Sequence, residues 1–141
     1  MRNYLIIALV VAIGAALYFV YGTDDASPQM TDAIGAPIVE IAMPTQLSSN
    51  AQLGQTIFTD KCAACHGENA VGQQGVAPPL IHIIYEPSHH GDESFQRAVA
   101  IGVPQHHWSF GNMPPVEGLT RADVAMVVDY IRTIQRANGI N

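Results

Sequence analysis

The sequence predicts an all-α domain that follows an N-terminal transmembrane helix. Two segments, one ending near residue 62 and one starting near residue 120, carry apolar residues at helical spacing. No segment alternates apolar and polar residues as a half-buried strand would. From Tyr4 to Gly22 no residue is charged and most are apolar. Together these patterns favour a small helical domain carried on an apolar anchor.

The apolar N-terminal run is long enough to cross a bilayer. Its nineteen residues would form a helix of about 28 Å, close to the ~30 Å hydrocarbon core. Arg2 precedes the run and Asp24 follows it, so the positive-inside rule places the N-terminus in the cytoplasm and the rest of the chain in the periplasm. We therefore expect residues 1–22 to be a single-pass anchor in the cytoplasmic membrane, or an uncleaved signal sequence. A cleaved signal peptide is the alternative, and it would release the remainder as a soluble exported protein.

Residues 23–48 are expected to be a linker, because they are polar, contain three prolines and show no helical period. The stretch 36–43 is more apolar than a free tether requires, which makes it a candidate contact with the domain or with a partner. After Gly22, five Lys or Arg residues stand against twelve Asp or Glu, a net charge near −7. Such a chain argues against a nucleic-acid partner and favours partners with a basic or an apolar patch.

Three helices are expected in the domain at 49–141, separated by loops rich in Gly and Pro. The first begins at Ser49, which forms a capping-box pattern with Gln52. A short middle helix covers 93–101, and Asp92 is positioned to cap it.

The last helix has the clearest pattern. Thr120 and Asp123 resemble a capping box in which Asp replaces the usual Glu. Asp129 and Arg132 lie outside the apolar stripe and are spaced to form a weak pair. The stripe that should face the core consists of Val124, Val127, Val128, Ile131 and Ile134.

The segment from Cys62 to His66 is a C-x-x-C-H motif, the attachment signature of c-type haem. Residues three apart in a helical turn point to the same side, so the thiols of Cys62 and Cys65 can reach the two vinyl groups of one porphyrin. His66 then lies beneath the iron and offers a ring nitrogen. The alternative is a disulfide or a redox C-x-x-C with an incidental histidine, but no thioredoxin-like βαβ pattern accompanies it. The motif therefore predicts one covalent haem c.

With this motif, residues 50–138 resemble class I cytochromes c. The resemblance implies a fold in which the first and last helices cross at nearly a right angle, with a short middle helix and loops that enclose the haem. It also implies that Gly54, Phe58 and Tyr130 form the crossing. The matching segments are Leu53–Phe58, Cys62–Gly67, Ala77–Leu80, Gly111–Pro115, Leu119–Thr120 and Val127–Ile131.

The resemblance also suggests the groups around the haem. Met113 matches the second axial ligand and would complete the coordination of the iron with His66, whereas Met126 lies in the last helix, where packing is the expected role. Pro78 matches the residue whose carbonyl accepts the N–H of the axial histidine, with the adjacent Pro79 as the alternative. Trp108 could donate its indole N–H to a haem propionate, as tryptophan does in some relatives.

Five histidines crowd into 26 residues of the loops: His82, His89, His90, His106 and His107. They could form a second metal site, or a docking surface that charges in mild acid. Exposed loop histidines with one or two hydrogen bonds to propionates are the simpler interpretation. We favour it because no ligand spacing such as H-x-x-x-H is present.

Three functions are compatible with this sequence. The first is a membrane-tethered single-electron carrier that is not itself an enzyme; the resemblance implies a respiratory position between a quinol:cytochrome c reductase, or a dehydrogenase, and a terminal oxidase. The second is a haem c subunit of a larger membrane redox enzyme, which would co-purify with its complex. The third is a haem sensor or peroxidase with a removable sixth ligand, which would bind carbon monoxide when reduced.

Overall fold

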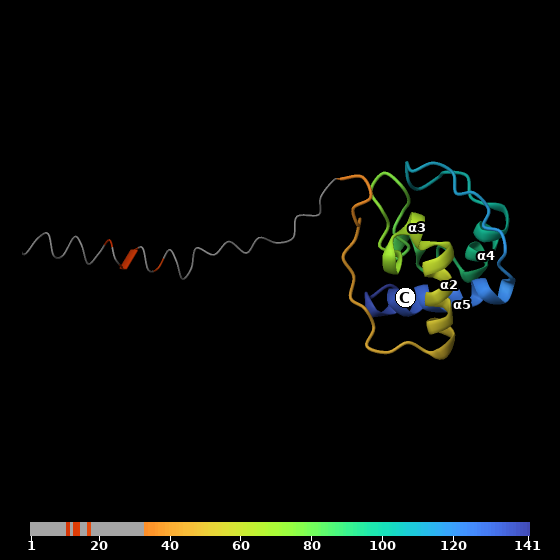
Figure 1. The fold of residues 1–141 in the computed structure, drawn as a ribbon, viewed down its shortest axis with the longest axis horizontal. Coiled ribbons are helices and arrows are strands. Elements are labelled where there is room, and N and C mark those ends of the chain that lie inside the picture. Colours follow the sequence, from red (N-terminus) through yellow and green to blue (C-terminus); the bar gives the residue numbers. More distant parts are fainter. Residues whose placement is uncertain (1–10, 12, 15–16, 18–32) are drawn as a thin grey trace, which may run out of the picture.

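Six helical segments and the loops between them form the domain (Figure 1). The structure is a computed structural model that describes residues 11, 13, 14, 17 and 33–141. In this described part the regular β structure is limited to two isolated bridges, so the predicted all-α class is confirmed. The elements are α2 (Ser49–Lys61), α3 (Ala63–His66), η1 (Glu68–Ala70), η2 (Ile83–Tyr85), α4 (Asp92–Ile101) and α5 (Arg121–Ala137).

The domain is built around the crossing of α2 and α5 (Figure 1). At the crossing, a Cβ added to Gly54 would overlap the backbone carbonyl of Met126 on α5. The absence of a side chain on Gly54 therefore allows the two helix backbones to touch. Next to this contact the buried rings of Phe58 and Tyr130 pack with their centroids 5.8 Å apart. The glycine and the aromatic pair thus occupy the positions that the resemblance implied.

The cap of α5 agrees with the prediction; α2 begins at Ser49 as predicted, but its cap differs. Thr120 and Asp123 form the predicted capping box. At α2 the N-cap is Ser48, one residue earlier than expected: its extended backbone ends the preceding segment and its Oγ accepts from the N–H of Ala51 at 3.1 Å. The side chain of Gln52 donates instead to the carbonyl of Leu47 at 3.1 Å.

The middle helix also starts differently from the prediction, because Asp92 is its first residue and Gly91 is its N-cap. The Asp92 carboxylate accepts from Nε of Arg132 at 2.9 Å, so it bridges to α5. The prediction that Arg132 pairs with Asp129 is therefore wrong.

Arg132 is only 7% exposed, and it binds the segment that leads into α4. Its guanidinium donates to the backbone carbonyls of Tyr85 (2.6 Å) and His90, and to the side-chain oxygen of Gln135 (2.6 Å). Gln135 is fully buried and its amide donates to the carbonyls of Leu80 (2.8 Å) and Tyr85 (3.1 Å). Two polar side chains of α5 thus fix the course of residues 80–92.

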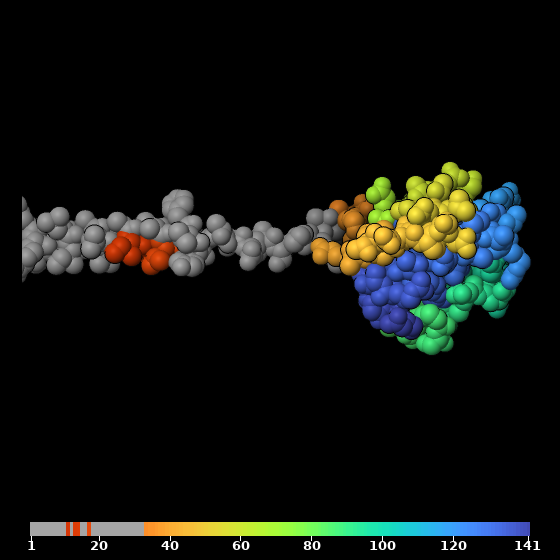
Figure 2. All heavy atoms as spheres, turned by 90° about the horizontal axis from the view of Figure 1, so that it is seen from below, coloured from red at the N-terminus to blue at the C-terminus, as the bar shows by residue number. Residues whose placement is uncertain are grey.

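The segment 33–48, expected to be the second half of a linker, lies along the surface of the domain (Figure 2). The N–H groups of Ile38 and Val39 both donate to the carbonyl of Val71 at 3.2 Å. Farther along, Ala42 exchanges two hydrogen bonds with the side chain of Asn138, at 2.7 and 2.9 Å. Ile41 and Leu47 pack against the core. These contacts make 33–48 part of the domain, whereas 23–32 lies outside the described residues.

The predicted anchor, residues 1–22, lies almost wholly outside the described residues. Within the described part of the chain, every helix is too short or too polar to cross a bilayer.

Candidate functional site

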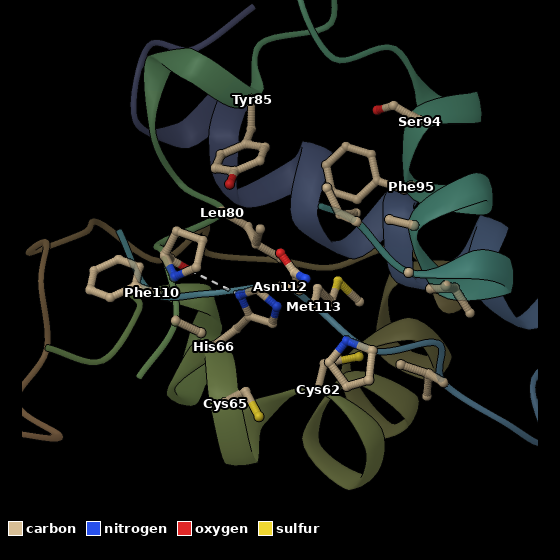
Figure 3. A pocket seen from close by; sticks show the side chains of 18 of the residues that line it. Cys62, Cys65, His66, Leu80, Tyr85, Ser94, Phe95, Phe110, Asn112 and Met113 are labelled. Carbon is tan, nitrogen blue, oxygen red and sulfur yellow. Dashed lines mark hydrogen bonds between the residues drawn. The ribbon is translucent and has the colours of Figure 1, made fainter. Parts of the chain in front are cut away.

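A cavity of about 480 Å³ opens beside the α2–α5 crossing, within the ~300–1,000 Å³ typical of cofactor sites (Figure 3). In Figure 3 the side chains of Cys62, Cys65 and His66 rise from one wall, and Leu80, Tyr85 and Phe95 lie across from them. The lining is mainly apolar and includes Phe58, Leu80, Phe95, Val103, Val127 and Ile131.

The C-x-x-C-H motif forms the single helical turn α3, which follows α2 after a break at Cys62. Cys62 is half-buried and Cys65 is exposed, and both are free thiols rather than a disulfide. Burial, with a smaller effect from Cys65, raises the pKa of Cys62 to about 11. A redox-active C-x-x-C needs a lowered thiol pKa. Cys62 is therefore a poor attacking thiol.

The ring of His66 is buried and held in one orientation. Its Nδ1 lies 2.9 Å from the carbonyl oxygen of Pro78, a distance at which Nδ1–H donates to that oxygen. The bond goes to Pro78 and not to Pro79, and it leaves Nε2 free as a ligand (Figure 3). Burial lowers the pKa of His66, and the hydrogen bond to Pro78 opposes this in part. A neutral imidazole with a fixed second nitrogen is the form that ligates metals.

Sequence reasoning missed Gln73, whose side chain bonds the free backbone carbonyls of α3. The side-chain nitrogen of Gln73 lies within hydrogen-bond distance of the carbonyls of Ala63 (3.2 Å), Ala64 (2.9 Å) and Cys65 (3.1 Å). The last carbonyls of a helix have no partner inside it, so this amide holds the haem-attachment turn from outside. Gln73 lies in a loop, and no local pattern signals its role.

Met113 lines the cavity together with Asn112 (Figure 3). Its backbone exchanges two hydrogen bonds with Val103, both 2.9 Å long, which join the two ends of the 103–113 loop. Asn112 braces the same loop by accepting from the N–H of Gln105 at 2.9 Å. Met126 does not line this cavity.

Trp108 also lines the cavity, and its indole N–H is buried with no hydrogen-bond partner among the described residues. Burial raises the pKa of the nearby Tyr85 hydroxyl to about 12, and the indole of Trp108 offsets this rise in part. The indole N–H and the Tyr85 hydroxyl nevertheless do not reach hydrogen-bond geometry. A buried donor without an acceptor is rare in folded proteins, and it indicates a missing partner.

Four of the five loop histidines come together, although their spacing in the sequence predicted no site. His89 and His90 precede α4, and His106 and His107 follow it. Neighbouring ring centroids in this group lie 4.4–6.0 Å apart. Desolvation and the other three imidazoles lower the pKa of His107. His82 lies apart from them and packs edge-on against Trp108.

Comparison with known proteins supports the interpretation of the site. The model of the cytochrome c family matches residues 51–135. The chain is similar to a cbb3-type cytochrome c oxidase subunit CcoP of Cereibacter sphaeroides, 38% identical over 80 residues, which are 55% of this chain and 25% of that protein. A CcoP subunit of Azospirillum brasilense is 50% identical over 36 residues, 22% of this chain and 12% of that protein. The chain thus spans a quarter or less of the length of these relatives. No solved structure matches it.

Proposed function

Because this chain belongs to the cytochrome c family, we propose that it is a membrane-tethered carrier of single electrons with one covalent haem c. Haem c is attached through Cys62 and Cys65, the two thiols of the C-x-x-C-H turn. Haem c alternates between ferric and ferrous iron and so accepts and releases one electron.

The residues around the cavity fit this group. Two unpaired thiols and a buried imidazole lie on one wall, and apolar side chains form most of the rest. The unpartnered indole of Trp108 supplies a donor that a propionate would accept.

We propose His66 and Met113 as the axial ligands. The observation that carries this assignment is the hydrogen bond from His66 to Pro78, because it turns Nε2 toward the cavity in the ligating tautomer. Met113 supports it from the 103–113 loop, whose backbone is pinned to Val103. If both residues ligated the iron, the chain's side chains would shield and tune it, and thioether ligation would raise its potential.

The membrane tether, the periplasmic location and the respiratory partners are parts of the same proposal. They rest on the apolar run of 1–22 and on the family, with a quinol:cytochrome c reductase or a dehydrogenase as donor and a terminal oxidase as acceptor. The tether predicts that the protein stays with membranes after a high-salt wash, because salt screens charges but does not extract an apolar helix. A mature N-terminus mapped beyond Gly22 would contradict it.

A second candidate is a haem c subunit of a cbb3-type or related oxidase, favoured by the similarity to CcoP subunits. Solubilisation with a mild detergent separates the two. A carrier comes away alone, whereas a subunit co-purifies with its complex.

Substitution of the two candidate methionines tests the ligand assignment. Met113→Ala should abolish the long-wavelength charge-transfer band of sulfur-ligated ferric haem, lower the potential and open the iron to carbon monoxide. Met126→Ala is the control, and it should leave the band in place because Met126 is outside the cavity. The reverse pattern would refute the assignment. A wild-type protein that binds carbon monoxide readily at neutral pH would favour the sensor or peroxidase.

A further inference from the structure

The histidines at the rim of the cavity form a group whose ligand atoms converge. One ring nitrogen from each of His89, His90 and His107 lies within 4.8 Å of those from the other two. The first two come from the loop before α4, and His107 comes from the loop after it, so the group exists only in the folded chain. It lies outside the C-x-x-C-H turn, although His90 and His107 also line the cavity.

The distances are close to those of a metal site. In a tetrahedral site with metal–nitrogen bonds of about 2.0–2.1 Å, neighbouring ligand nitrogens lie about 3.3–3.4 Å apart. Nε2 of His89 and Nε2 of His107 are already 3.3 Å apart. The nitrogens of the three histidines all lie within 4.8 Å of one another, so the nitrogen of His90 is at most about 1.5 Å too far from the other two. Small side-chain movements at the surface close that difference.

His90 is prepared for ligation by its other nitrogen. Its Nδ1 lies 2.6 Å from the carbonyl oxygen of Ile84, so Nδ1–H donates to it and Nε2 keeps a free lone pair. Ligating histidines in metal sites are oriented in this way by a carbonyl or a carboxylate. The backbone carbonyl of His90 also accepts from buried Arg132, which fixes this part of the loop.

The chemistry of the group selects the class of ion. Three imidazoles without a carboxylate or a thiolate suit copper, zinc or nickel, whereas calcium and magnesium require oxygen ligands. Among divalent ions of the first row, nitrogen sites bind copper more tightly than zinc.

We propose that His89, His90 and His107 bind one divalent transition-metal ion, with copper preferred over zinc. The ion joins the loop before α4 to the 103–113 loop. That second loop also carries Met113, so the ion stiffens the rim of the cavity on the side of the proposed thioether ligand. This site stands independently of which redox partners the protein uses.

Metal binding to the haem-loaded full-length protein, first stripped with a chelator, tests the proposal. Zinc titrated by calorimetry should bind at one site per chain, and copper should compete for it with higher affinity. Electron paramagnetic resonance of the copper-loaded protein, read beside the haem signal, should show hyperfine splitting from imidazole nitrogens. An oxygen-only coordination sphere, or no binding at all, would overturn the proposal.

Two substitutions remove one ligand each with little change to the fold. In His90→Asn the amide nitrogen can replace Nδ1 as donor to Ile84, while Nε2 is lost; His107→Asn removes a surface imidazole. Each should weaken zinc binding by roughly 100-fold or more. His82→Asn is the matched control: its amide oxygen can replace the acceptor for the N–H of Ile84, and affinity should not change. Unchanged haem absorbance verifies folding. Wild-type affinity in both ligand variants would refute the site.

Discussion

The Arg132→Met substitution tests how the buried guanidinium fixes residues 80–92. It can act through its hydrogen bonds to uncharged oxygens or through its ion pair with Asp92. The substitution keeps most of the side-chain volume and removes five donors. The carbonyl of His90 and the side-chain oxygen of Gln135 then lose the donor that the described structure gives them, while the carbonyl of Tyr85 keeps its bond from Gln135. The partner Asp92 is 71% exposed, so water can solvate it after the change.

The two orphaned acceptors decide the magnitude. Each buried polar group left without a partner costs about 1–3 kcal/mol, which gives a loss of about 2–6 kcal/mol in the free energy of unfolding. The ion pair with Asp92 contributes at most about 1 kcal/mol because one member is exposed. Removing the desolvation of the guanidinium offsets part of the loss, so we expect a net loss in the lower half of that range.

Urea unfolding of the haem-loaded protein, followed by far-UV circular dichroism, measures the loss. Asp92→Asn provides the comparison, because it removes the charge but retains an oxygen acceptor for Nε of Arg132. We expect its loss to be about 1 kcal/mol, including the weaker interaction with the N-terminus of α4. Equal losses in the two variants would refute the argument, since the ion pair and not the carbonyl network would then hold the segment.

Three other predictions address the crossing, a cap and the cavity. Gly54→Ala gains about 1 kcal/mol of helix propensity, but the overlap of the new Cβ with α5 outweighs this gain, so we expect a destabilised protein. A stabilised protein would disprove the close contact. The control is Ala125→Gly at an exposed position of α5, which should lose about 1 kcal/mol and so measures the propensity effect alone. Thr120→Ala should cost about 1 kcal/mol at neutral pH and raise the pKa of Asp123, seen by NMR titration, because Thr120 lowers it in the native state. Part of that loss should vanish as the pH falls through the native pKa of Asp123, because a carboxyl with a lowered pKa stabilises the folded state only above that pKa. An Asp123 pKa that is the same in the variant and in the wild-type protein would contradict the prediction. Trp108→Phe should move the pH-dependent step of the reduction potential to higher pH if the indole stabilises an ionised propionate; an unmoved step would exclude that bond.

The predictable features were those whose cause lies within a few residues. The capping box at Thr120 is a local pattern, and the C-x-x-C-H turn places its own three functional side chains. The resemblance supplied Gly54 and Pro78, because it carries long-range information that a short segment lacks. In the structure Gly54 lies at the helix crossing, and the carbonyl of Pro78 accepts a hydrogen bond from His66.

The features that were missed depend on partners far away in the chain. Arg132 is polar on a helix face, and its burial is favourable mainly because of acceptors 40 to 47 residues earlier in the chain. Gln73 is an ordinary loop residue until the fold brings it to the end of α3. The histidines gather because the loop that follows α4 folds back toward the start of that helix and brings His107 beside His89 and His90, a juxtaposition that spacing along the sequence does not reveal.

The docking of residues 33–48 has a consequence for how far the domain can travel. If the proposed anchor ends at Gly22, ten residues, 23–32, separate it from the docked segment, and ten residues reach at most about 35 Å when fully extended. A free linker of 26 residues would reach about 90 Å, so the volume open to a tethered domain shrinks by the cube of 26/10, roughly 18-fold. A short tether raises the effective concentration of the domain toward a neighbour in the same membrane. If the domain is the tethered electron carrier proposed above, its exchange partners must stand within that radius, and proximity in the bilayer would select them.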